Sequence, residues 1–175
     1  MSAEVDQLVG ELSKLLRANG QTLATVESCT GGLVGAAMTS PAGASDVFVG
    51  GLLTYSNKAK KALAGVRAAT LKAHGAVSGQ VAIEMASGGR ARLGADIAVS
   101  ITGIAGPGGG SDEKPVGTVW VCVDAAGSRD CRRFVFPGDR EAVRAWSVLS
   151  ALGLVIQMLG GRSESLLHEC ERFEG

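Results

Sequence analysis

The chain has 175 residues, 46% hydrophobic and 19% charged, so it can bury one substantial core and does not resemble a disordered segment. Basic and acidic residues number 17 each, which gives no global basic field for nucleic acid. No basic start with an apolar block opens the sequence, and no apolar run could span a bilayer. We therefore expect a cytoplasmic protein that binds a small polar ligand and neither nucleic acid nor membrane.

The predicted elements alternate between helix and strand. Apolar residues recur at helical spacing from Val5 to Leu16, and the apolar run 95–102 is typical of a strand buried on both faces. The turn signal DAAGSRD predicts a hairpin in which Cys122 and Cys131 lie opposite each other. In chain order we predict a helix over 5–16 closed by Asn19 and Gly20, a strand over 22–26, a helix over 31–39, a strand over 47–56, short helices within 58–74, a helix over 80–93, a strand over 95–102, hairpin strands over 116–124 and 129–136, and a helix over 139–160.

This order predicts the fold class. Strands interleaved with helices, plus one hairpin, favour a three-layer α/β/α single domain, residues 1–175, with a mixed, mostly parallel sheet. We place its core at about 5–160 and interpret 161–175 as a polar C-terminal tail. The stretch ALGLVIQML, residues 151–159, has too few polar positions for a surface helix, which predicts a homo-oligomer, with a dimer as the expected form. A central helix buried within the monomer fits the same pattern.

A serine and a cysteine stand side by side in ESCTGGL, residues 27–33, between a predicted strand and a predicted helix. Backbone N–H groups and the helix dipole converge on an anion at such a turn, and Gly31 and Gly32 let a ligand approach the backbone. Alternatively, Ser28 or Thr30 simply caps the helix and the glycines relieve packing. The sequence leaves both interpretations open.

Three other segments carry polar or glycine-rich patterns. Tyr55 and Lys60 lie in TYSNKAK, after a predicted strand. The glycine-rich loop 102–110 also follows a strand, where α/β sheets bind ligands, but it fits neither the dinucleotide fingerprint nor a Walker loop. Arg140 and Arg144 lie one helical turn apart and either present two cations to a ligand or are ordinary surface charges.

Cysteines and histidines argue against two common kinds of site. The spacing of the four cysteines fits no metal-ligand or thioredoxin-like pattern, so we expect reduced thiols and no metal. Only His74 and His168 are present, so a Ser-His-Asp triad is not favoured. A catalytic serine would need a lysine as its base.

Five motifs occur in order across about residues 5–160: VESCTGGL, GGLLTYSNKAKKALAGV, LKAHGAVS, ADIAVSITGIAGPGGGSDEKPVGTVWV and PGDREAVR. Together they resemble the CinA C-terminal family, whose stand-alone members are nicotinamide-nucleotide amidohydrolases. The resemblance implies hydrolysis of the carboxamide of nicotinamide mononucleotide to the carboxylate and ammonia, in pyridine nucleotide recycling, without a cofactor. Departures such as Val26, where alanine is usual, do not touch this chemistry. Larger members carry an N-terminal nucleotide-pyrophosphatase-like domain, which we do not expect here.

The resemblance also implies roles for individual residues. Ser28 would be the nucleophile, neutral Lys60 its base, and Tyr55 would orient the lysine or protonate the departing ammonia. With the two glycine-rich segments included, the expected substrate-binding residues are Glu27, Thr30, Gly31, Gly32, Thr102, Gly103, Gly106 and Arg140. Which of these groups meets the phosphate and which the oxyanion stays open.

Two alternative functions are compatible with the sequence. Cys29 could be the nucleophile, with Glu27 and Lys60 assisting a thiolate as glutamate and lysine do in nitrilase-like enzymes. The chain could instead be a non-catalytic nucleotide-binding or interaction module, because CinA proteins take their name from competence and DNA-damage induction. Ammonia release from the mononucleotide separates the two enzymes from the module.

Overall fold

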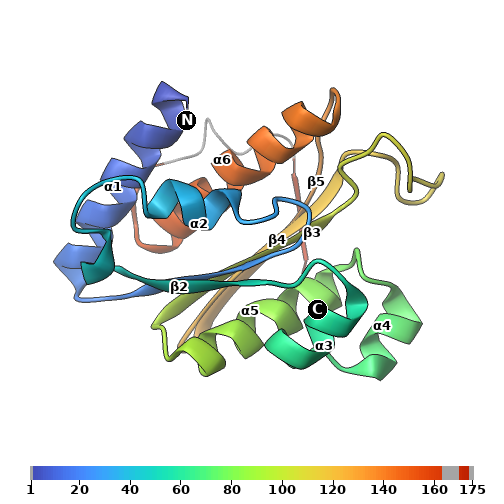
Figure 1. Cartoon of the computed structure of the whole chain (residues 1–175), viewed down its shortest axis with the longest axis horizontal. Helices are drawn as coiled ribbons and strands as arrows, with labels where there is room; N and C mark the ends of the chain where they lie inside the picture. Colours follow the sequence, from blue (N-terminus) through green and yellow to red (C-terminus); the bar gives the residue numbers. More distant parts are fainter. Residues whose placement is uncertain (1, 163–169, 174–175) are drawn as a thin grey trace.

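The centre of the molecule is a six-stranded mixed sheet, seen in the computed structural model of residues 2–162 and 170–173 (Figure 1). The strands are β1 (Leu23–Glu27), β2 (Phe48–Leu53), β3 (Ile97–Gly103), β4 (Thr118–Ala125), β5 (Ser128–Val135) and β6 (Cys170–Arg172), in the order β2-β1-β3-β4-β5-β6. The pairs β2–β1 and β1–β3 are parallel, and the remaining neighbours are antiparallel. Because β1, β2, β3 and β5 therefore share one direction, the predicted mixed sheet with most strands aligned is confirmed.

Helices cover both faces of this sheet. They are α1 (Ala3–Asn19), α2 (Leu33–Met38), α3 (Asn57–Ala64), α4 (Ala68–His74), α5 (Gly79–Leu93) and α6 (Arg140–Met158), with a short 3-10 turn at Ala44–Asp46. Figure 1 shows α1, α2 and α6 on one face and α3, α4 and α5 on the other, which is the predicted three-layer arrangement. The largest buried cluster joins α1, α6 and the sheet, and it includes Leu12, Leu152 and Phe134.

The apolar second half of α6 lies inside the molecule. Every residue from Ser147 to Ile156 is buried, and most belong to the cluster that α6 shares with α1 and the sheet. The stretch 151–159 is thus explained by the alternative of a central helix, and it gives no reason to expect a homo-oligomer, which stays a prediction. No helix within the described residues is long and apolar enough to cross a membrane.

The predicted hairpin is confirmed, and part of the polar tail forms a strand. Cys122 and Cys131 are direct partners in the β4–β5 register, and both are buried free thiols. Within the tail, Cys170–Arg172 form β6, which pairs with β5. A three-residue strand is too short to show periodicity, so no sequence pattern indicated it. Residues 163–169, with His168, and 174–175 of the tail lie outside the described residues.

The carboxyl ends of β1, β2 and β3 lie at one edge of the sheet because these strands are parallel. The turn after β1, the segment after β2 and the long loop after β3 therefore converge there. The turn differs locally from its prediction, since α2 begins at Leu33 and not at Gly31. Gly31 and Gly32 have φ of +64° and +99°, outside the helical region, so they form the turn that precedes the helix.

Candidate active site

A pocket of about 280 Å³ lies at this edge of the sheet. It is lined by Ser28, Cys29, Tyr55, Lys60, Ala76, Val77, Thr102, Gly103, Ala105 and Arg140. The structure thus brings together six of the predicted site residues, namely Ser28, Tyr55, Lys60, Thr102, Gly103 and Arg140. The other five, Glu27, Thr30, Gly31, Gly32 and Gly106, are not among its lining residues.

Lys60 is a buried amine held between two oxygens. Only 1% of its surface is exposed, and its Nζ lies 2.8 Å from Ser28 Oγ and 2.8 Å from the carbonyl oxygen of Thr54. Helix α3, which carries Lys60, is capped by Ser56, whose hydroxyl accepts the N–H of Ala59. Desolvation lowers the pKa of Lys60 from 10.5 to about 8. Near that pH much of the amine is neutral and can accept a proton.

Ser28 and Cys29 are adjacent but have different surroundings. The N–H of Ser28 donates to the carbonyl of Ile101 in β3 at 3.0 Å, which fixes the serine beside the lysine. Cys29 is 6% exposed and belongs to the main hydrophobic cluster. Burial raises the pKa of its thiol to about 11, although nearby backbone amides and Lys60 act in the opposite direction. A thiol with this pKa stays protonated near neutral pH, whereas the Ser28 hydroxyl lies 2.8 Å from the Lys60 amine.

Glu27 faces the N-terminus of α2 and is not among the residues that line the pocket. Its side-chain oxygens accept the backbone N–H groups of Gly32 at 2.9 Å, Val34 at 3.2 Å and Gly35 at 2.8 Å. The residue is 1% exposed. The anion expected at this helix N-terminus is therefore the protein's own carboxylate, and the amide of Gly32 is already bound.

Tyr55 lies at the rim of the pocket and is 66% exposed. In this structure the Lys60 amine donates a hydrogen bond to the backbone carbonyl of Thr54, and the expected role of Tyr55 in orienting the lysine stays a prediction. A backbone carbonyl gives no side-chain signal, so sequence reasoning missed Thr54. The exposed ring leaves Tyr55 free to meet a ligand that enters the pocket.

The connection between α4 and α5 forms one wall of the pocket. Ala76 and Val77 lie in it, and sequence reasoning gave them no role although their motif LKAHGAVS was recognised. Thr102 Oγ1 donates to the carbonyl of Ala76 at 2.8 Å. Lys114 Nζ, in the loop after β3, donates to the carbonyls of His74 and Val77 at 2.9 and 2.8 Å. The wall is thus fixed to both β3 and the loop that follows it.

Two arginines of α6 border the site. Arg140 lines the pocket and donates from Nη1 to the carbonyl of Gly106 at 2.9 Å, so Gly106 contacts Arg140 without itself lining the pocket. Arg144 donates from Nη2 to the carbonyl of Thr30 at 2.9 Å, and Thr30 itself is fully buried. Both arginines also line a neighbouring hollow of about 690 Å³. Arg140 is therefore shared by the pocket and the hollow.

The charges around the pocket favour an anionic ligand. Lys60 and Arg140 are its charged lining residues, and no aspartate or glutamate of the described residues lines it. A cleft lined by one sign of charge raises the local concentration of ligands of the opposite sign. A small nucleotide with a phosphate group matches this field.

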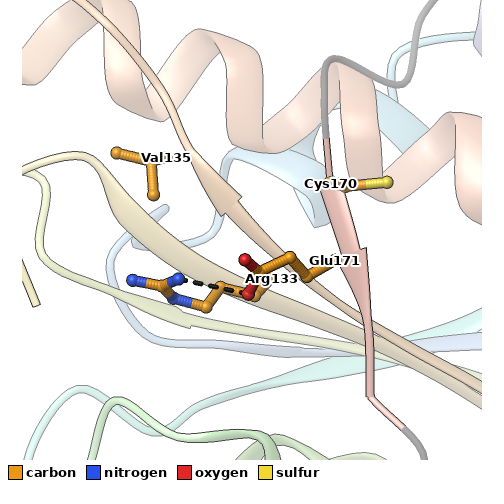
Figure 2. Close-up of a pocket in the computed structure, with 4 residues that line it drawn as sticks. All are labelled: Arg133, Val135, Cys170 and Glu171. Atoms are coloured by element: carbon orange, nitrogen blue, oxygen red, sulfur yellow. Dashed lines mark hydrogen bonds and ion pairs between the residues drawn. The ribbon is translucent and has the colours of Figure 1, made fainter.

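A second pocket, of about 310 Å³, lies on β5 and β6 and lacks these features (Figure 2). It is lined by Arg133, Val135, Cys170 and Glu171. Figure 2 shows Arg133 and Glu171 joined across the two strands, and their nearest charged atoms are 3.2 Å apart. The charges there already neutralise each other.

Comparison with known proteins identifies the family, because residues 5–159 match the CinA C-terminal domain. The chain belongs to the CinA C-terminal domain family. Nicotinamide-nucleotide amidohydrolase PncC of Escherichia coli K12 is 51% identical over 151 residues, which cover 86% of this chain and 92% of that protein. A CinA-like protein of Citrifermentans bemidjiense is 48% identical over 147 residues, but the chain spans only 36% of its length.

Solved structures of CinA proteins share the fold. The competence damage-inducible protein A of Klebsiella pneumoniae has a TM-score of 0.86 at 41% identity and covers 89% of this chain and 97% of its own. The competence/damage inducible protein of Agrobacterium tumefaciens has a TM-score of 0.88 at 40% identity and covers 91% and 98%. The sheet and helices of this CinA domain are therefore those of its family.

Proposed function

We propose that this CinA domain is a nicotinamide-nucleotide amidohydrolase that converts nicotinamide mononucleotide to nicotinic acid mononucleotide and ammonia. The observation that carries the proposal is the 2.8 Å contact between Ser28 Oγ and the buried Nζ of Lys60, inside a pocket that also holds Arg140. The substrate follows from the relative named nicotinamide-nucleotide amidohydrolase, which is 51% identical and similar in length.

Ser28 is the proposed nucleophile and Lys60 its general base. An N–H of neutral Lys60 donates to the Thr54 carbonyl, which leaves the lone pair of Nζ to face the Ser28 hydroxyl. As Ser28 Oγ attacks the carboxamide carbon, its proton passes to Lys60, and the carbonyl oxygen becomes an oxyanion.

The tetrahedral intermediate then collapses with release of ammonia. The C–N bond breaks as protonated Lys60 returns its proton to the leaving nitrogen, and an ester between Ser28 and the nicotinic acid nucleotide remains. Water attacks this ester with Lys60 again as base; Lys60 then returns that proton to Ser28 Oγ as the Ser28–acyl bond breaks, and the acid product is released as its carboxylate. Tyr55, at the rim, is the residue we expect to contact the ring or the departing amine.

Arg140 is the proposed partner of the phosphate. It lies between the pocket that contains Ser28 and the larger hollow beyond, so a ligand with its carboxamide at Ser28 can extend its phosphate toward this guanidinium. Binding energy gained there helps to position the distant carboxamide. Thr102 and Gly103 line the space between.

The test is an assay of ammonia release by the purified chain without added metal. We expect turnover of nicotinamide mononucleotide and much lower kcat/KM for nicotinamide riboside and free nicotinamide, which lack the phosphate. Tight binding of the mononucleotide without any ammonia would instead support the nucleotide-binding module. The cytoplasmic location and the homo-oligomer stay predictions beside this proposal.

A further inference from the structure

We propose that Glu27 is a positioning residue, whose carboxylate closes the nucleophile turn onto the start of α2 and thereby holds Ser28 against Lys60. The inference rests on the proposed function and assigns Glu27 no contact with the substrate. It replaces the expectation that Glu27 binds the substrate or assists a thiolate.

The side chain of Glu27 closes a ring around the turn that carries Ser28. Glu27 is the last residue of β1, and its carboxylate accepts backbone N–H groups 5, 7 and 8 residues further along the chain. The ring formed in this way encloses Ser28, and it needs the positive φ of Gly31 and Gly32 to turn α2 back toward the strand. The glycines of the motif therefore serve this closure.

The main chain of Glu27 also supports the lysine. Its carbonyl accepts the N–H of Thr54 at 2.8 Å and the Thr54 hydroxyl at 3.2 Å. The carbonyl of Thr54 in turn accepts a hydrogen bond from Lys60 Nζ. Glu27 is thus connected to both catalytic groups, to Ser28 through the chain and to Lys60 through Thr54.

The position of Glu27 requires an acceptor at both side-chain oxygens. Oε2 accepts from Gly32 and Val34, and Oε1 accepts from Gly35. A glutamine has nearly the same shape, but its NH₂ group would face an N–H donor on one side. One buried amide would then lose its acceptor and the turn would shift, while the substrate contacts at Arg140 would remain.

The experiment compares Glu27→Gln with Glu84→Gln. Glu84 is a matched control because its carboxylate also accepts a backbone N–H, that of Arg67 at 2.9 Å, and the Thr70 hydroxyl at 2.7 Å, but it joins α4 to α5 outside the pocket lining. We expect Glu27→Gln to lower kcat about 10- to 100-fold with KM within about threefold, because small misplacements of reacting groups have effects of that size. Glu84→Gln should lower the melting temperature with kcat within about twofold.

Hydrogen exchange gives a readout of the closure itself. The amides of Gly32, Val34 and Gly35 should exchange faster in Glu27→Gln than in the wild type or in Glu84→Gln. An unchanged kcat in Glu27→Gln would overturn the proposal, as would an equal loss of kcat in both variants that follows their melting temperatures. Faster exchange at these amides together with the selective loss of kcat would support it.

A serine-directed fluorophosphonate separates this proposal from the proposed function. Ser28 Oγ would displace fluoride from phosphorus, with its proton taken by Lys60, and labelling requires no amide turnover. We expect Glu27→Gln to be labelled at least about tenfold more slowly than the wild type, for the same geometric reason. If the wild type were labelled but released no ammonia, the proposed function would fail, and equal labelling of the two proteins would overturn the role of Glu27.

Discussion

The pockets at Ser28 and at Arg133 are nearly equal in volume, about 280 and 310 Å³, but their charged side chains have different surroundings. At Ser28 a lysine is buried against a hydroxyl and a carbonyl. At Arg133 the cation is paired with Glu171, an exposed carboxylate. Burial without an opposite charge disfavours the charged form of a titratable group, and desolvation lowers the pKa of Lys60 in this way.

We expect the largest change in kcat when the serine–lysine pair is lost. Ser28→Ala and Lys60→Met should each lower kcat by about a thousandfold or more, and the double variant should be little worse because the two act as one unit. Matched changes in the other pocket, Arg133→Met and Glu171→Gln, should leave kcat within about twofold, since an exposed ion pair contributes little. Ammonia release and thermal melts of these five variants and the wild type provide the measurement.

A comparable loss of activity from either change at the second pocket would contradict the expected difference between the two pockets. So would a folded Lys60→Met variant that kept its turnover, because the buried amine would then have no role in the reaction.

The next largest effect is expected in the pH dependence of kcat/KM. Because desolvation lowers the pKa of Lys60 to about 8, the fraction of neutral base rises through that pH. We expect kcat/KM to increase about tenfold per pH unit below pH 8 and to level off above it, as for a single general base. A pH series of initial rates with the mononucleotide measures the profile. A flat profile from pH 6 to 9 would contradict Lys60 as the base.

The smallest effect is expected at Cys29. Cys29→Ala should keep kcat within about threefold, because burial raises the thiol pKa to about 11 and little thiolate forms at neutral pH. The variant should lose some stability, about 1 kcal/mol, since a buried sulfur is removed from the core. Urea unfolding and ammonia release measure the two quantities. A folded, inactive Cys29→Ala beside an active Ser28→Ala would make this a thiol enzyme.

Regular patterns made much of the fold predictable. The apolar run of β3 and the hairpin that pairs Cys122 with Cys131 were indicated by periodicity and turn residues, and both are confirmed. The pairing of Ser28 with Lys60 was different, since they are 32 residues apart and no spacing rule joins them. The motif resemblance suggested that pair, and the shared edge of parallel strands explains how the fold brings the two residues together.

The features of the fold and the site that could not be predicted depend on where a side chain points, on contacts of backbone atoms and on packing. Glu27 follows a strand and could face either the pocket or α2, and its direction is set by a turn that only the folded chain defines. The carbonyl of Thr54 is chemically the same as any other carbonyl, so its contact with Lys60 leaves no trace in the sequence. The apolar pattern of α6 likewise fitted an interface and an interior equally well, and only packing decided between them.

The burial of Lys60 also connects proton binding to folding. Its pKa is about 8 in the folded chain, below the ordinary value of 10.5, so between these values the unfolded chain holds more protons. The free energy of unfolding contributed by this group therefore rises with pH from about 8 toward 10.5, and near neutral pH the buried ammonium works against the folded state. The buried amine of Lys60 thus weakens the fold near neutral pH.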